Sequence, residues 1–91
     1  MSAFRDNPAR SRYELDAPEG VTFADYREVG AARVLTHVES PEEARGKGYA
    51  AALMAGIVAD ARANGHKLRA ACPYAVAYFK RHPEEVAGIE V

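Results

Sequence analysis

The chain is poor in cysteine, because Cys72 is the only one among its 91 residues. A single cysteine cannot form an intramolecular disulfide or supply a cysteine zinc site, which argues against a secreted disulfide scaffold. Long apolar runs are lacking too. Residues 1–12 contain none, and the alanine-rich stretch 49–59 is far too short to span a bilayer. From these absences we expect a cytoplasmic protein with no membrane partner.

The sequence also has little excess charge of either sign. Twelve Lys and Arg residues against 13 Asp and Glu give a formal net charge of -1. Binding to a nucleic-acid backbone depends on a concentrated positive surface, so we expect no nucleic-acid partner. The three histidines have no spacing that would join them as ligands, and we expect no metal site.

The length of the chain indicates one domain with a modest core. The residues are 48% apolar and 27% charged, which is ordinary for a globular protein. Asn7-Pro8 is a turn signal, so we interpret residues 1–10 as a loose leader and residues 11–91 as the single folded domain. Because a core of this size has little stability to spare, a monomer or a weak homodimer is expected.

Alternating polar and apolar residues predict three antiparallel strands in the first half of the chain. Residues 11–16 place Tyr13 and Leu15 on one face of a half-buried strand. Residues 21–29 and 32–39 are β-rich runs separated by a short glycine-containing break, which favours a hairpin. Phe23 and Tyr26 are predicted to join Tyr13 in the core of the sheet.

The alternation in residues 32–39 also assigns side chains to faces, because neighbours along a strand point to opposite sides. One predicted face carries Leu35, His37 and Glu39, and the other carries Val34, Thr36 and Val38.

The second half of the chain changes in character. Residues 49–64 are strong helix formers with one apolar stripe, and Gly65 is placed to end that helix. Residues 67–72 predict a fourth strand, residues 74–81 a second helix and residues 88–91 a short closing strand. The order is β-β-β-α-β-α-β, so the fold class is α+β with a small mixed, mainly antiparallel sheet.

The most distinctive stretch is Arg45-Gly46-Lys47-Gly48-Tyr49-Ala50, between a strand and the long helix. Its glycines allow a tight turn and close approach of a ligand to the backbone. The first turn of the following helix has unpaired N–H groups and the positive end of the helix dipole. Arg45 and Lys47 add positive charge, so the stretch predicts a cradle for phosphate groups.

The spacing of this turn distinguishes between phosphate ligands. An ATPase loop would need Ser or Thr after Lys47, where Gly48 stands, and a dinucleotide loop would need a third glycine after a first strand. The turn instead fits the pattern Arg or Gln, two residues, Gly, one residue, Gly or Ala, in which Arg45, Gly48 and Ala50 match. This pattern indicates the phosphates of an acyl-coenzyme A. The alternative is that the glycines only make a tight connection.

At this point the chain resembles the GCN5-related N-acetyltransferases, and more closely their miniature branch, which lacks the N-terminal acceptor-binding helices. The resemblance rests on residues 12–14, 36–39, 45–50 and 72–74, the last together with 82–84. It implies the acyl-CoA N-acyltransferase fold, acetyl-CoA or CoA as the small-molecule coenzyme, and an amine acceptor that the sequence does not name.

The resemblance also implies roles for particular residues. The backbone of Val38 and Glu39 would contact pantetheine where two strands diverge, and the thioester would lie near Cys72. Tyr78 is expected to line the pocket. The turn that would wrap the pyrophosphate consists of Arg45, Gly46, Lys47, Gly48, Tyr49 and Ala50.

Catalysis is where the chain departs from the family pattern. Typical full-length members carry an asparagine after this strand and, seven residues later, a tyrosine that protonates the departing thiolate. Here Cys72 and Phe79 stand at those positions. Cys72 could donate the proton or accept the acyl group, and His37 or Glu39 could act as general base.

The preferred hypothesis is an acetyl-CoA-dependent N-acetyltransferase in which the acceptor attacks the acetyl group directly. The alternatives are a non-catalytic CoA-binding or regulatory module and a small interaction domain with a structural glycine turn.

Overall fold

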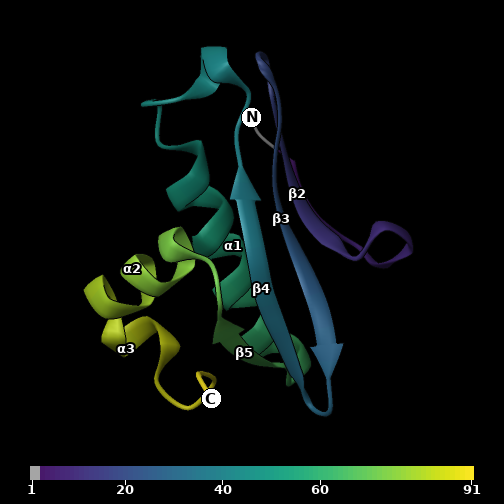
Figure 1. The fold of residues 1–91 in the computed structure, drawn as a ribbon, viewed down its shortest axis with the longest axis vertical. Coiled ribbons are helices and arrows are strands. Elements are labelled where there is room, and N and C mark those ends of the chain that lie inside the picture. Colours follow the sequence, from purple (N-terminus) through teal and green to yellow (C-terminus); the bar gives the residue numbers. More distant parts are fainter. Residues whose placement is uncertain (1–2) are drawn as a thin grey trace.

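A five-stranded sheet in the order β1-β2-β3-β4-β5 forms one layer of the computed structural model, which describes residues 3–91 (Figure 1). The first four strands pair antiparallel, whereas β4 and β5 pair parallel. The strands are β1 Phe4–Asn7, β2 Arg12–Ala17, β3 Gly20–Val29, β4 Ala32–Glu39 and β5 Lys67–Ala70. The predicted mixed, mainly antiparallel sheet is therefore confirmed.

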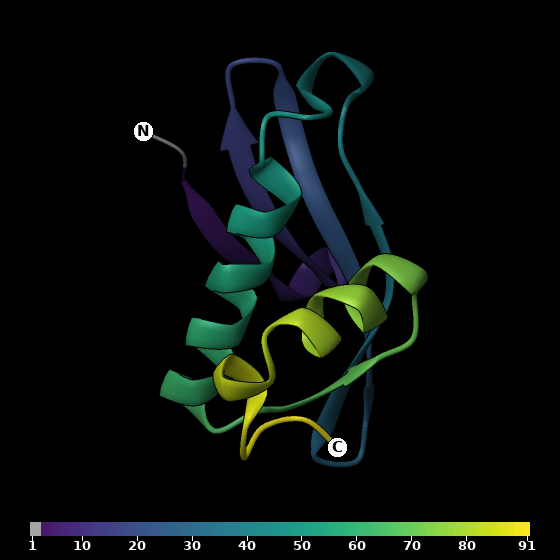
Figure 2. The same cartoon turned by 90° about the vertical axis from the view of Figure 1, so that its left-hand side faces the viewer.

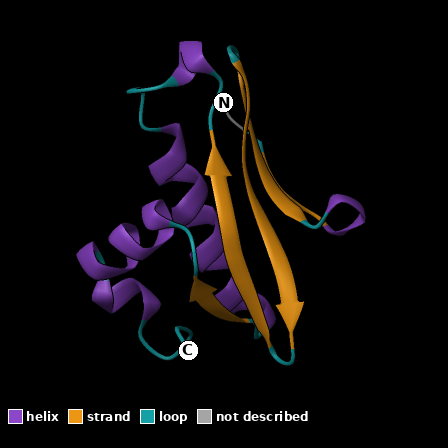
Figure 3. Cartoon of the chain, in the orientation of Figure 1, coloured by secondary structure: helices purple, strands orange, loops and turns teal. Residues whose placement is uncertain are grey.

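Helices form the second layer and cover one face of the sheet (Figure 2). They are α1 Tyr49–Asn64, α2 Pro73–Arg81 and the short α3 Pro83–Val86, with 3-10 turns at Pro8–Arg10 and Glu42–Ala44. Figure 3 shows this separation of strands from helices, which defines the α+β class. The chain passes from β4 through α1 to the parallel β5, a crossover that long helical connections allow.

The core lies between the sheet and the two longer helices. The apolar stripe predicted for α1 is confirmed, since Leu53, Met54, Ile57, Val58 and Ala61 are its buried residues. Gly65 ends the helix with a φ of 74°, a conformation that glycine adopts without steric cost. From the sheet the core receives Tyr13, Leu15, Ala24, Tyr26, Leu35 and Leu68.

The N-terminal segment differs from the expected loose leader. Phe4–Asn7 pairs with β2 as an edge strand, and Pro8–Arg10 forms a 3-10 turn that leads into β2. The ring of Phe4 stacks on Tyr13, with ring centres 5.8 Å apart, and lies directly against Gly56 of α1. The prediction is therefore wrong from Phe4 onward, because one aromatic ring and a strand ladder anchor the segment. Residues 1–2 lie outside the described part of the chain.

A bulge in β4 overturns the predicted assignment of faces. Asp25 of β3 pairs with His37, but the next residue, Tyr26, pairs with Leu35, so Thr36 is an extra residue. Leu35 is fully buried under the helices, whereas the His37 and Glu39 side chains are 54% and 53% exposed. Strict alternation fails at a bulge, and these two polar side chains therefore occupy the helix-free face.

The predicted closing strand at residues 88–91 is reduced to a single bridge between Leu68 and Glu90. Pro83 begins the short helix α3 rather than an extended segment, and the chain then turns at Gly88 with a φ of 82°. Lys67 Nζ donates a hydrogen bond to the Gly88 carbonyl at 2.6 Å. The end of the chain is thus held as a loop along the outer edge of β5.

Candidate functional site

The parallel strands β4 and β5 diverge at one end. Their pairing runs from Ala32 opposite Lys67 to Leu35 opposite Ala70 and then stops. The backbone N–H groups of Ala71 and Cys72 both donate to the Leu35 carbonyl, at 2.9 and 3.1 Å, and close the paired region. Beyond it, β4 continues to Glu39 without a strand neighbour on that side anywhere in residues 3–91. Main-chain groups at the end of β4 are therefore left for another partner.

The glycine turn lies beyond this end of β4, and its backbone conformation explains its sequence. Gly46 and Gly48 have φ values of 81° and 84°, which residues with a side chain rarely adopt. A Cβ atom at either position would meet nothing within 4 Å, so the backbone faces open space. Such a turn can bring N–H groups close to a ligand, and the residues present fit a phosphate group.

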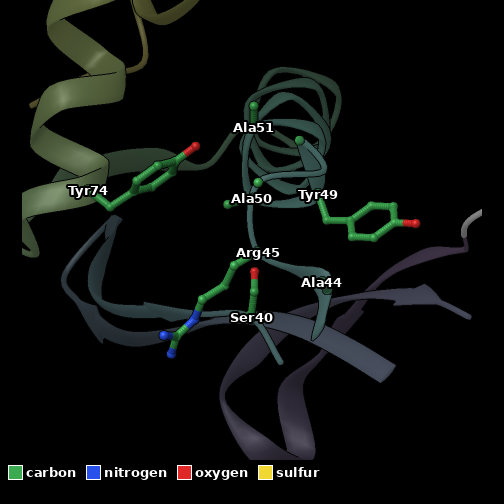
Figure 4. A pocket seen from close by; sticks show the side chains of 9 residues that line it. Ser40, Ala44, Arg45, Tyr49, Ala50, Ala51 and Tyr74 are labelled. Atoms are coloured by element: carbon green, nitrogen blue, oxygen red, sulfur yellow. The ribbon is translucent and has the colours of Figure 1, made fainter. Parts of the chain in front are cut away.

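A pocket of about 270 Å³ opens at this turn (Figure 4). Tyr74 reaches in from α2 on the side opposite Ser40 and Arg45. The lining therefore joins the end of β4, the turn, the N-terminus of α1 and the start of α2. The lining residues are Ser40, Ala44, Arg45, Gly46, Gly48, Tyr49, Ala50, Ala51 and Tyr74.

The electrostatics of the pocket favour an anion. The first intrahelical bond of α1 runs from the Ala52 N–H to the Gly48 carbonyl, so the preceding amides have no helical acceptor. Gly48 supplies no side-chain cap, and the first turn of α1 has no acidic residue. Together with Arg45, these amides and the helix dipole create a positive site at the pocket wall.

Lys47 takes a different position from the one expected. It does not belong to the pocket lining, and its ammonium group pairs with the Glu19 carboxylate in the turn between β2 and β3. This ion pair and hydrogen bond lower the pKa of Glu19 and raise that of Lys47. Of the two basic residues predicted to face phosphate, only Arg45 lines the pocket.

Tyr74, rather than Tyr78, is the tyrosine that α2 brings to the pocket. The Tyr78 hydroxyl donates to Glu85 Oε1 at 2.9 Å, and its ring lies 4.3 Å from that of His82. Burial, with the Glu85 hydrogen bond second, raises the pKa of Tyr78 to about 12. The sequence carried one signal that could have pointed to Tyr74, which is the proline before it. Pro73 fixes the start of α2 and therefore the position of the side chain that follows.

Cys72 occupies the point where β5 ends and α2 begins. It is only 6% exposed and caps α2, with its Sγ accepting the Ala75 N–H at 3.3 Å. Its own N–H is bound to Leu35, so the thiol lies beside the divergence of the strands.

His37 and Glu39 lie on the opposite side of β4 from Cys72. His37 Nε2 is 2.8 Å from Glu39 Oε1, and both side chains are about half exposed. If Nε2 carries the proton, Nδ1 keeps its lone pair free to accept another. Phe23 belongs to this same face, since its ring lies 6.1 Å from that of His37, and its predicted place in the helix-covered core is wrong.

The mixed sheet, the crossover through α1 and the glycine turn define a small α+β domain of the acyl-CoA N-acyltransferase type. A family model described as GCN5-related N-acetyl-transferase matches residues 12–89. The chain therefore belongs to the GCN5-related N-acetyltransferase family. A comparison with curated proteins gives no match.

Two other kinds of feature are absent from residues 3–91. The helices there are too short or too polar to cross a membrane. The same residues contain no group of three or more His, Cys, Asp or Glu side chains arranged to hold a metal ion.

Proposed function

We propose that the protein binds acetyl-CoA and transfers its acetyl group to an amine acceptor. The observation that carries the proposal is the coincidence of two features. A pocket of about 270 Å³ lies at the N-terminus of α1, and the unpaired end of β4 lies next to it. Acyl-CoA has both a pyrophosphate and a long amide-containing arm, and it can use both features at once.

The backbone of the turn would bind the pyrophosphate through the amides of Gly46, Gly48 and the first residues of α1. A hydrogen bond to a charged group contributes about 1.5–3 kcal/mol, so a few aimed amides suffice for specific binding. Arg45 adds a charged donor, and Tyr74 supplies an aromatic wall. The backbone of Val38 and Glu39 would pair with the amides of the pantetheine arm, as an added strand would.

The acetyl thioester supplies an activated carbonyl carbon for attack by the amine nitrogen. The His37–Glu39 pair would take the proton that the amine loses, with Nδ1 of His37 as the accepting atom. A backbone N–H of β4 would stabilise the oxyanion. Cys72 would give its proton to the sulfur that departs and regain one from solvent, so the products are an amide and free CoA.

A second function, CoA binding without turnover, is favoured by a specific observation. The hydroxyl of Tyr78 is engaged by Glu85, and Phe79, which stands at the position of the family's catalytic tyrosine, is 3% exposed and has no proton to give. Catalysis therefore depends on Cys72. If Cys72 cannot replace the tyrosine, the protein remains a coenzyme-binding module.

Turnover of acetyl-CoA with a panel of amines, including protein lysines, tests the proposal. We expect Cys72→Ala and His37→Gln each to lower kcat by about 100-fold, the usual contribution of a general acid or base, with CoA affinity unchanged. His66→Gln, remote from the pocket lining, is the matched control and should keep full activity. CoA binding without acetylation of any amine would support the second function, and no binding at all would reject both.

A further inference from the structure

The loop from Ser40 to Gly48, whose second part is the phosphate-binding turn, is attached at two places to the hairpin between β2 and β3. At its start, Thr22 Oγ1 donates to Ser40 Oγ at 3.1 Å. At its end, the Glu19 carboxylate accepts from Lys47 Nζ, 28 residues further along the chain. Gly20 lies against Pro41, since a Cβ at Gly20 would come within 3.0 Å of the proline ring. The same hairpin thus contacts this loop near its start and near its end.

Glu19 is built into this contact rather than free in solvent. Its side chain is 18% exposed, and its Oε1 is buried without a hydrogen-bond partner in the described residues. The hydrogen bond from Lys47 is the largest of the effects that lower the pKa of Glu19. The carboxylate therefore joins the turn to the sheet through Lys47.

The contact between Glu19 and Lys47 matters because of where it holds the Lys47 side chain. Lys47 stands between Gly46 and Gly48, yet it does not line the pocket that its two neighbours line. Gly46 and Gly48 have no side chains, so their backbone lines the pocket while the side chain of Lys47 lies outside it. Because glycine has more conformational freedom than any other residue, a turn with two glycines gains most from an external restraint.

We propose that Glu19 is a positioning residue for coenzyme binding, which holds Lys47 outward so that the backbone of Gly46 and Gly48 stays directed into the pocket. Lys47 is then a structural partner of Glu19 and makes no contact with phosphate. The inference rests on the proposed function and adds to it a residue outside the family-type glycine turn.

Calorimetric titration of CoA into the 91-residue chain and its variants tests this assignment. We expect Glu19→Ala and Lys47→Met each to raise the Kd for CoA about threefold to fivefold, as loss of one exposed ion pair implies. The double variant should be no worse than either single one, because both changes remove the same restraint. Glu19→Gln should recover part of the affinity, since its amide oxygen still accepts from Lys47. Glu43→Ala, an exposed carboxylate nearby, is the matched control.

The salt dependence of binding separates positioning from direct contact. With Lys47 paired outward, all variants should show the wild-type dependence of Kd on ionic strength. If Lys47 instead binds phosphate, Lys47→Met will flatten that dependence and Glu19→Ala will tighten binding. If Glu19 serves the fold alone, its loss will lower Tm and leave Kd unchanged. Either result overturns the inference while leaving coenzyme binding intact, whereas absence of CoA binding by the wild type rejects the proposed function itself.

Discussion

At the scale of single residues, Glu14 shows how a carboxylate is kept charged in a sheet. It is 3% exposed, and it accepts from Arg12 Nε at 2.6 Å, Arg5 Nε at 2.7 Å and Asn7 Nδ2 at 3.3 Å. The hydrogen bond from Arg12 is the largest of the effects that lower its pKa. Burial alone would raise the pKa, so the donors outweigh the loss of hydration.

This balance predicts a pH-dependent effect of Glu14→Gln. A group whose pKa is lowered by folding contributes stability above its unfolded pKa, here 4.5, and loses it as pH falls through the folded value. We expect the variant to lose about 1–3 kcal/mol of unfolding free energy at pH 7.

Urea unfolding at pH 7 and below pH 4 measures the effect, and the difference from wild type should shrink at the lower pH. Asp16→Asn removes the same charge from an exposed partner of Arg5 and should cost less than about 1 kcal/mol. A loss that stays constant with pH would mean that the Glu14 charge is not what the arginines stabilise.

Residue by residue, the sequence predicted the parts of the site that depend on local geometry. The turn from Arg45 to Ala50 could be placed because positive-φ glycines before a helix are a local signal. The outward direction of Lys47 could not, because its partner Glu19 is 28 positions away. Tyr74 was missed for a similar reason, since its place in the lining depends on how α2 packs beside the turn.

At the scale of elements, strand β1 depends on a glycine in the middle of helix α1. Gly56 leaves room for the Phe4 ring, whose Cδ1 would lie 2.6 Å from a Cβ at this position. Glycine inside a helix costs roughly 0.5–1 kcal/mol relative to alanine. This cost is offset because packing of the Phe4 ring attaches the edge strand β1 to the core.

We therefore predict that Gly56→Ala destabilises the protein by about 1–3 kcal/mol, since overpacking outweighs the gain in helix propensity. In a Phe4→Ala background the same change should stabilise it by about 0.5–1 kcal/mol. Urea unfolding of the four proteins gives this double-mutant cycle. Ala59→Gly, at an exposed position of α1, measures propensity alone. Stabilisation by Gly56→Ala in the wild-type background would contradict the Phe4 contact.

The sequence predicted the bounds of a helix or strand well where a single pattern of polar and apolar residues runs through it. Helix α1 and strand β4 have the predicted bounds of 49–64 and 32–39. The faces of β4 were not predicted, because a one-residue bulge leaves composition unchanged and reverses every side chain beyond Thr36. Strand β1 was missed because four residues with one aromatic carry too little pattern, and tertiary contacts decide their structure.

At the scale of the whole molecule, a ligand can contribute a large share of the stability. The Cα atoms have a radius of gyration of 12.2 Å, and a domain of this size has a small net free energy of unfolding. The proposed site joins the end of β4, the glycine turn and both longer helices. A coenzyme that binds only when these elements are assembled must stabilise the entire fold.

We predict that CoA at about 100 times its Kd adds about 2.7 kcal/mol and raises Tm by roughly 10–20 °C, given the small unfolding entropy of such a domain. A thermal-shift titration with acetyl-CoA, CoA and ATP measures this. ATP has phosphates for the turn but no pantetheine arm for the unpaired end of β4, so its shift at equal concentration should be several-fold smaller. Equal shifts with CoA and ATP would mean that the turn binds phosphate alone and that the divergence of β4 and β5 plays no part.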